Sequence, residues 1–277
     1  MKITRISVYR ADLPMKEGFY SWSTQSHSVF DTTVVTIDTD DGITGTGECC
    51  PLGPTYLPAY AEGVRAGIAT IAPELIGQDP THLDCINDTL DHLLKGHPYV
   101  KSAIDMACWD ILGKTTALPL YTLLGGKQQD RAKLYKVVTR TDPDAMAARI
   151  PEYRAQGYRN FQVKVGENQL TDINRIRKIA ACMEPGEVLN ADANTGWKQH
   201  EALVVADAIK DLPREYGILL YFEQPCLTYE ECLAVRQHTN LPFVLDECID
   251  SLPALLRASH DNAMDLINLK ISRMGGL

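Results

Sequence analysis

The sequence lacks several patterns that would assign it to a common functional class. Its eight cysteines contain no CxxC pair, and its seven histidines contain no HxxxH or HExxH pattern, so a zinc-protease site has no support. No long run of lysine and arginine occurs and the formal net charge is −9, so we expect no nucleic-acid surface. No GxGxxG follows a candidate strand, which argues against a dinucleotide site.

Long apolar runs are also absent. No window approaches about 18 uninterrupted apolar residues, the length that a membrane span requires. The N-terminal segment MKITRISVYRADLP alternates apolar and polar residues, unlike a signal peptide. Without a secretory context, we expect a cytoplasmic protein whose cysteines are buried, reduced thiols. The composition, 45% hydrophobic and 23% charged, is ordinary for a globular protein with a large core.

The first 125 residues predict an α+β domain. Residues 2–12, 30–38 and 43–49 have the alternation of strands, and Asp41-Gly42 marks a hairpin turn between the last two. Helical spacing of apolar residues follows at 57–76, 83–95 and 99–116. We expect this domain to end near Gly125-Gly126, where paired glycines stop a helix.

From 126 to 277 the pattern alternates between strands and helices. Short β-rich runs occur at 133–138, 159–165, 187–191, 218–222, 242–245 and 266–271. Helical stretches separate them, at 143–156, 169–183, 198–210, 228–238 and 251–258. Repeated βα units indicate a parallel sheet, either doubly wound or closed into a TIM-type barrel.

The number of these units is small for a closed barrel. An eightfold barrel takes roughly 200–250 residues, and only about 150 follow the first domain. We therefore expect about six of eight units, in a barrel domain truncated at its C-terminal strands.

Charged and amide residues mark the carboxyl ends of the predicted strands. They are spaced by roughly one βα unit, so in a barrel they would line one mouth, where such enzymes place their sites. The set comprises Lys164, Asp192, Asn194, Glu223, Asp246, Glu247 and Lys270. A single strand-end aspartate is usually a turn residue and a single lysine is usually solvated, but the set in strand register is far more specific.

This set suits one kind of chemistry. Three carboxylates from successive strands form an oxygen-rich site for Mg²⁺, and lysines on the flanking strands would face each other across it. A proton next to a carboxylate is weakly acidic, and its removal requires stabilisation of the resulting dianion by a metal ion. A lysine beside the metal would have a lowered pKa and could act as the base near neutral pH.

Several runs of sequence resemble one known family. FQVKVG (161–166), NADANTGW (190–197), YFEQP (221–225), VLDE (244–247) and INLKISRMGGL (267–277) are similar to the mandelate racemase/muconate lactonizing enzyme group of the enolase superfamily. Residues 45–48 and 103–114 resemble the capping, substrate-specificity domain of that family.

The resemblance implies roles for the strand-end residues. Asp192, Glu223 and Asp246 would bind Mg²⁺, with Mn²⁺ as an alternative ion, and Asn194 and Glu247 would support these ligands. Lys164 and Lys270 would be the acid/base pair. The family often has Lys-x-Lys at the second strand, and here Gln162 takes the first position. The pKa of Lys164 would then be less depressed than in a two-lysine site.

Within the family, three segments indicate the substrate. Residues 17–23, 48–67 and 96–99 resemble the members that act on hydroxyproline and proline-betaine substrates. This implies a hydro-lyase that removes the α-proton of a 3-hydroxyproline and eliminates water to give Δ1-pyrroline-2-carboxylate. An epimerase or racemase of proline betaines or N-acyl amino acids is the alternative, and an inactive truncated fragment is an alternative of another class.

Three aromatic residues are candidates for substrate binding. Tyr20, Trp22 and Tyr56 would be first-domain residues that close over the substrate, and an aromatic face could hold a pyrrolidinium ring. Packing between the domains is an equally good explanation for them. We expect a small-molecule amino-acid substrate, no nucleic-acid or membrane partner, and a homo-oligomer.

Overall fold

The computed structural model describes residues 1–277, which form two compact units. Unit 1 comprises Met1–Met15, Val29–Asp130 and Lys270–Leu277, and unit 2 comprises Lys16–Ser28 and Arg131–Leu269. No helix is long and apolar enough to cross a membrane. All eight cysteines are free thiols, but Cys85 and Cys182 are exposed, contrary to the expectation that all would be buried.

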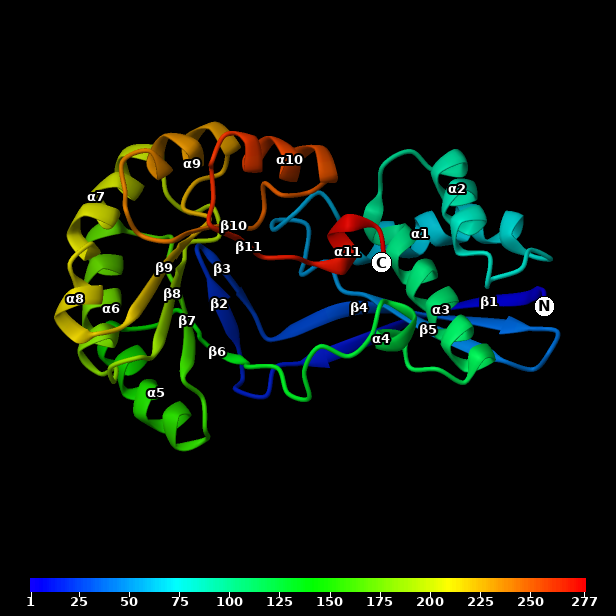
Figure 1. Ribbon diagram of the computed structural model, residues 1–277, viewed down its shortest axis with the longest axis horizontal. Helices are drawn as coiled ribbons and strands as arrows, with labels where there is room; N and C mark the ends of the chain where they lie inside the picture. Colours follow the sequence, from blue (N-terminus) through cyan, green and yellow to red (C-terminus); the bar gives the residue numbers. More distant parts are fainter. The chain divides into compact units, whose positions relative to one another are not determined.

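Unit 1 combines an antiparallel sheet with helices. Its sheet has the order β1-β4-β5, and its longest helix, α3, packs against β5 (Figure 1). The close packing of β5 against α3 requires glycine at positions 45 and 47. Cβ atoms added to Gly45 and Gly47 would lie 2.1 and 1.9 Å from carbonyl oxygens of α3. The strands are β1 (Ile3–Pro14), β4 (Val29–Thr39) and β5 (Thr44–Cys49). The helices are α1 (Ala61–Ile71), 3₁₀ helix η1 (Ala72–Leu75), α2 (Leu83–Leu93), α3 (Pro98–Thr116), α4 (Leu120–Leu123) and α11 (Ile271–Met274).

Unit 2 contains a six-stranded parallel sheet with the order β6-β7-β8-β9-β10-β11. A doubly wound sheet would reverse its order at a switch point, whereas sequential order is typical of a barrel. The strands are β6 (Tyr135–Val138), β7 (Asn160–Lys164), β8 (Val188–Asp192), β9 (Leu219–Glu223), β10 (Phe243–Leu245) and β11 (Leu266–Ile267). The predicted α/β fold class, with an α+β unit and a barrel-type parallel sheet, is confirmed.

Helices cover the outer face of this sheet (Figure 1). Alternate strand residues pack under them and form the core, among them Phe161, Val163, Leu189, Ala191, Leu220, Phe222, Phe243 and Leu245. The helices are α5 (Pro143–Ala155), α6 (Gln169–Ala181), α7 (Gln199–Ile209), α8 (Leu212–Tyr216), α9 (Tyr229–Arg236) and α10 (Leu252–His260). Because strand side chains alternate, the residues between these core positions lie on the opposite face.

Two details of the strands differ from the sequence prediction. The sixth strand was expected over 266–271, but β11 ends at Ile267 and Lys270 precedes α11. The physical reason is that β11 pairs only with β10, over two register pairs, so no further ladder holds it extended. The second detail is a hairpin of β2 (Tyr20–Trp22) and β3 (Gln25–His27), which the pattern did not predict and which groups with unit 2.

The division of the chain into a capping domain, residues 1–125, and a barrel domain, residues 126–277, stays a prediction.

Candidate active site

The strand ends of unit 2 bring charged residues to one level of the sheet. Lys164 pairs in register with Asp192, and Asp192 pairs with Glu223. Asp246 lies two residues beyond Val244, which pairs with Glu223. All four side chains are buried, so the structure concentrates one cation and three carboxylates where little water screens them.

Lys164 is held by the last residue of β8 and by a residue of the loop that follows it. Its Nζ donates hydrogen bonds to Asp192 and to Asn194 Oδ1, the latter at 3.0 Å. Asn194 in turn donates from its backbone to Asp192 Oδ1 (2.9 Å) and from Nδ2 to Glu247 Oε1 (2.9 Å). Asn194 and Glu247, predicted as supporting residues, therefore lie in the same hydrogen-bonded group as Lys164.

Amide side chains orient two of the carboxylates by donating hydrogen bonds to them. Gln162 Nε2 donates to both Asp192 Oδ2 (3.0 Å) and Glu223 Oε2 (2.9 Å). Asn190 also donates to Glu223 Oε2, and Asn268 donates to Glu223 Oε1 at 2.8 Å. From the sequence, Gln162 is only a departure from the family pattern, and the two asparagines are not among the predicted site residues.

A signal for these amides was present in the sequence. Gln162, Asn190 and Asn268 each stand two residues before a predicted site residue, Lys164, Asp192 and Lys270 respectively. Side chains two apart on a strand point to the same face, so alternation would place these amides beside the charged set.

Asp246 is positioned through the neighbouring strand. Gln224, which follows Glu223, accepts the backbone N–H of Asp246 at 2.8 Å and donates to the carbonyl of Cys226 at 3.0 Å. Gln224 has a φ of 33°, a left-handed conformation uncommon for a residue with a side chain. This strained residue connects the end of β9, which carries Glu223, with the residues after β10, which include Asp246.

The charges shift one another's pKa. Burial, together with the charges of Asp192 and Asp246, raises the pKa of Glu223 to about 7. Burial lowers the pKa of Lys164, but the charges of Asp192, Tyr20 and Glu223 outweigh it and the net pKa is well above the usual value. The sequence predicts a lowered pKa for a lysine beside a metal ion, whereas here the ion pair with Asp192 favours the ammonium form of Lys164.

The chemistry of the donor set suits a hard divalent cation, although the side chains are not arranged around one. Three buried carboxylates with one lysine leave an excess of negative charge, as the raised pKa of Glu223 reflects, and Mg²⁺ prefers such oxygen ligands. No group of three His, Cys, Asp or Glu side chains is arranged to hold a metal ion. Instead, the donors of Lys164, Gln162, Asn190 and Asn268 are directed at the carboxylate oxygens.

Tyr20 and Trp22 were expected in the first domain, but the structure groups them with the strands of unit 2. The hairpin that carries them is tied to this unit through Ser21, whose N–H donates to Thr139 Oγ1 at 2.6 Å, and Ser23, whose N–H donates to the carbonyl of Val165 at 3.1 Å. The ring centre of Tyr20 lies 5.8 Å from Lys164 Nζ and 5.0 Å from that of Trp22. Tyr20 is therefore near the strand-end lysine, and Trp22 lies beside Tyr20.

Lys270 and Tyr56 lie together in unit 1. Lys270 Nζ donates to the Tyr56 hydroxyl and is 5.0 Å from the centre of its ring. Two residues predicted for different roles, acid/base catalysis and substrate binding, are thus in direct contact. Their roles stay predictions.

Comparison with protein families matches both parts of the chain. Residues 2–125 match the family described as mandelate racemase / muconate lactonizing enzyme, N-terminal domain. Residues 145–277 match the enolase C-terminal domain-like family.

Similar proteins include enzymes of two reaction types. A cis-3-hydroxy-L-proline dehydratase of Roseibium aggregatum is 52% identical over all of this chain and 74% of its own length. An N-succinyl-L-Arg/Lys racemase of Bacillus cereus is 31% identical over all of this chain and 74% of its own length.

Solved structures agree with this similarity. A mandelate racemase/muconate lactonizing enzyme from Roseovarius nubinhibens has a TM-score of 0.93 and 42% identity, over 99% of this chain and 72% of its own. A member of the enolase superfamily from the same organism, complexed with magnesium, has a TM-score of 0.89 and 40% identity, over 100% of this chain and 73% of its own.

Proposed function

We propose that this chain, which belongs to the mandelate racemase/muconate lactonizing enzyme group of the enolase superfamily, is a metal-dependent hydro-lyase. Its proposed substrate is cis-3-hydroxy-L-proline and its proposed product is Δ1-pyrroline-2-carboxylate. The observation that carries the proposal is the buried group of Lys164, Asp192 and Glu223 at adjacent strand ends. This group joins a base to carboxylates that suit a metal ion.

The choice of substrate rests on similarity across the whole chain. The dehydratase relative matches at 52% identity, against 31% for the racemase relative, over the same extent of this chain. The segments at 17–23, 48–67 and 96–99 also resemble enzymes acting on proline derivatives. Since catalytic residues are shared across the family, resemblance in these segments is the more informative about substrate.

Asp192, Glu223 and Asp246 would hold Mg²⁺ or Mn²⁺. When bound, the ion supplies positive charge that offsets the negative charge developing on the substrate carboxylate as the α-proton leaves. The amides of Gln162, Asn190 and Asn268 orient two of the three carboxylates.

The elimination requires one base and one acid. In our proposal Lys164 removes the α-proton, and the C–H electron pair forms a double bond between Cα and C3. The C3–O bond breaks and the hydroxide leaves as water with a proton from the acid, after which the enamine tautomerises to the cyclic imine. Asn194 keeps the Lys164 amine in place, and Lys164 can accept a proton once Asp192 no longer holds its ammonium form. Lys270 as the second group of the acid/base pair rests on the sequence resemblance.

Epimerisation is the second candidate, favoured by the racemase relative and by an L-Ala-D/L-Glu epimerase of Bacillus subtilis at 30% identity. Both reactions begin with removal of the α-proton. An epimerase then returns a proton to the opposite face, whereas a dehydratase loses the hydroxyl before reprotonation.

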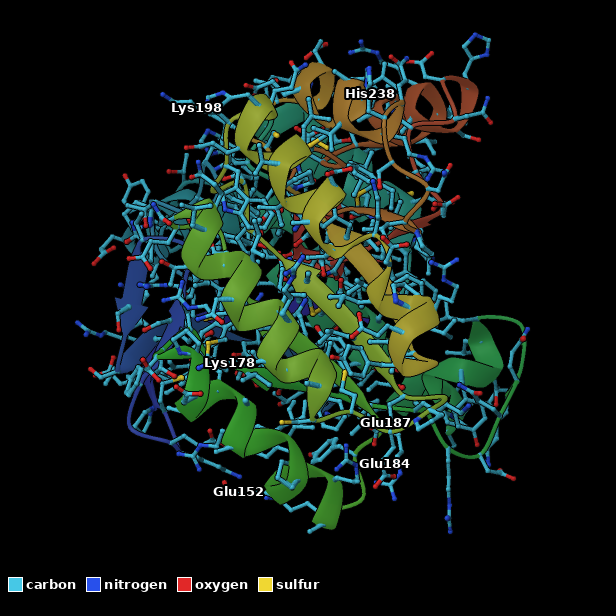
Figure 2. All side chains as sticks on the ribbon, turned by 90° about the vertical axis from the view of Figure 1, so that its left-hand side faces the viewer. Glu152, Lys178, Glu184, Glu187, Lys198 and His238 are labelled. Carbon is cyan, nitrogen blue, oxygen red and sulfur yellow. The ribbon has the colours of Figure 1, made fainter.

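The test is incubation of the chain and Mg²⁺ with cis-3-hydroxy-L-proline and, separately, with a proline betaine in D₂O, followed by NMR. We expect cyclic imine from the first substrate. Lys164→Met should lower this activity by on the order of 10³-fold, and Lys178→Met, which changes a half-exposed lysine on α6 (Figure 2), should not.

Epimerised betaine without any imine would contradict the dehydratase assignment. No exchange of the α-proton in either substrate, together with no rise of Tm on adding Mg²⁺, would favour the inactive alternative.

A further inference from the structure

Asp172, in the first turn of α6, accepts hydrogen bonds from four residues. Its carboxylate is completely buried and lies outside the set of predicted site residues. Oδ2 accepts the backbone N–H groups of Gly166 (3.0 Å) and Glu167 (2.8 Å) and the indole Nε1–H of Trp197 (3.0 Å). Oδ1 accepts from Arg175 Nη1 at 2.7 Å, so both oxygens of this buried group are engaged.

The partners of Asp172 Oδ2 belong to the loops that follow β7 and β8, and the candidate site lies at the ends of these strands. Gly166 and Glu167 follow Lys164 by two and three residues, and Trp197 follows Asn194 by three. These loops also interlock through their backbones. A Cβ atom on Gly166 would lie 2.1 Å from the Ala193 carbonyl oxygen, and one on Gly196 would lie 2.1 Å from the Gly166 carbonyl oxygen.

The loops need such a restraint because the sheet ladder ends where the site begins. Val165 N–H still donates to the Asp192 carbonyl at 3.0 Å, but beyond it the chain turns away from the strand direction. Asn194 and Thr195 have φ angles of 43° and 66°, conformations that persist only when surrounding contacts hold them. Asp172 supplies contacts to both loops from one side chain.

Arg175 extends the network to a third loop. Its Nε donates to the carbonyl of Thr141, after β6, at 3.0 Å, and its guanidinium balances the charge of Asp172. The buried pair therefore connects the loops after β6, β7 and β8.

We propose that Asp172 is a positioning residue. Its hydrogen bonds hold the loops after β7 and β8 and thereby align the Lys164 amine with the Asp192 carboxylate. The proposal rests on the proposed function for its catalytic consequence. Misplacement of a reacting group by about 1 Å can lower a rate on the order of 100-fold, so small loop movements would be measurable.

The test compares Asp172→Asn with Glu187→Gln. Glu187 is a second buried carboxylate of unit 2 that pairs with an arginine, Arg154, at 2.8 Å. Figure 2 shows Glu187 at the opposite end of this unit from Lys198, the neighbour of Trp197. Both variants neutralise a buried carboxylate with an arginine partner, but only Asp172 contacts the site loops.

We expect Asp172→Asn to lower kcat about 10- to 100-fold with KM changed less than about threefold, because alignment and not binding is lost. Glu187→Gln should keep kcat within about twofold of the original chain at a comparable loss of Tm. Hydrogen exchange should accelerate at residues 164–167 and 192–197 in Asp172→Asn alone. Equal kcat and equal exchange in the two folded variants would overturn the proposal.

If Asp172→Asn does not fold, the variant Trp197→Phe tests the positioning role of Asp172. It removes one donor to Asp172 and retains the ring stacked on Phe222 at 5.7 Å. We expect kcat to fall roughly 3- to 10-fold and exchange at 192–197 to accelerate. Wild-type values for both would overturn the proposal. Absence of turnover by the original chain would count against the proposed function alone, since the exchange comparison still decides the role of Asp172.

Discussion

The two ends of the parallel sheet in unit 2 use buried charge in opposite ways. At the carboxyl end, one lysine faces three carboxylates, and burial with mutual repulsion raises the pKa of Glu223 to about 7. At the amino end, Glu187 precedes β8 and accepts two hydrogen bonds of 2.8 Å from Arg154. Burial raises the pKa of Glu187, but the hydrogen bonds from Arg154 and from the Glu184 backbone, together with the charge of Arg154, outweigh it and the net pKa is lowered.

This difference distinguishes a candidate functional site from an ion pair that stabilises the fold. Matched charge at the amino end is satisfied within the protein and stabilises the fold, whereas the excess negative charge at the carboxyl end is unfavourable unless a cation joins it. In parallel α/β barrels, residues at the carboxyl ends of strands carry the chemistry and those at the amino ends carry stability. Mutations at the two ends should therefore affect different measured quantities.

The largest expected effect is at Glu223. Glu223→Gln should lower Mg²⁺-dependent turnover on the order of 10³-fold or more, because a proposed metal ligand and its charge are lost. Tm without metal should change by only a few degrees, since one of three mutually repelling carboxylates becomes neutral. Steady-state kinetics and thermal melts check this.

The control is Glu152→Gln, which alters an exposed residue of α5 (Figure 2) and should change neither quantity. Full activity of Glu223→Gln would show that Glu223 is not a required metal ligand.

At the amino end, Arg154→Met should affect stability and leave catalysis alone. It leaves the buried Glu187 without its cation, which costs roughly 3–5 kcal/mol of unfolding free energy. Urea unfolding measures the loss, and kcat of the folded variant should stay within about twofold of the original.

Arg149→Met, in an exposed pair with Glu152, should cost no more than about 1 kcal/mol. A large fall of kcat in Arg154→Met would show that the two ends are coupled.

The smallest expected effect is a pH dependence of stability. The folded protein binds a proton at Glu223 more tightly than the unfolded chain, since its pKa is about 7 against 4.5. Its contribution is therefore fully present below pH 4.5 and is lost as pH rises toward 7, a loss on the order of 1–3 kcal/mol.

Metal-free melts between pH 5 and 8 should show this slope, and Glu223→Gln should flatten it. Saturating Mg²⁺ should raise Tm more at pH 8 than at pH 5.5, where the proton competes for the carboxylate. If Mg²⁺ stabilises the protein equally at both pH values, or if Glu223→Gln leaves the slope unchanged, a group other than Glu223 causes the pH dependence.

Much of the fold followed from local patterns. Five of the six helices of unit 2, all but α8, and its strands β6–β10 lie close to their predicted ranges, because each βα unit carries its own apolar periodicity. The hairpin that carries Tyr20 and Trp22 escaped detection because its strands have three residues each, too few for a period. The early end of β11 also escaped, since strand length depends on how many neighbours the strand has.

The sequence by itself determined which chemistry is available at the sheet's carboxyl end. Lys164, Asp192, Glu223 and Asp246 recur at the spacing of one βα unit, and a parallel sheet must bring such residues to the same edge. Only the tertiary structure decided how they interact: that Lys164 pairs with Asp192, that amides orient Glu223, and that Asp172 holds the loops around them. Hydrogen bonds and pKa shifts depend on distances and burial between segments far apart in the chain, which no local pattern encodes.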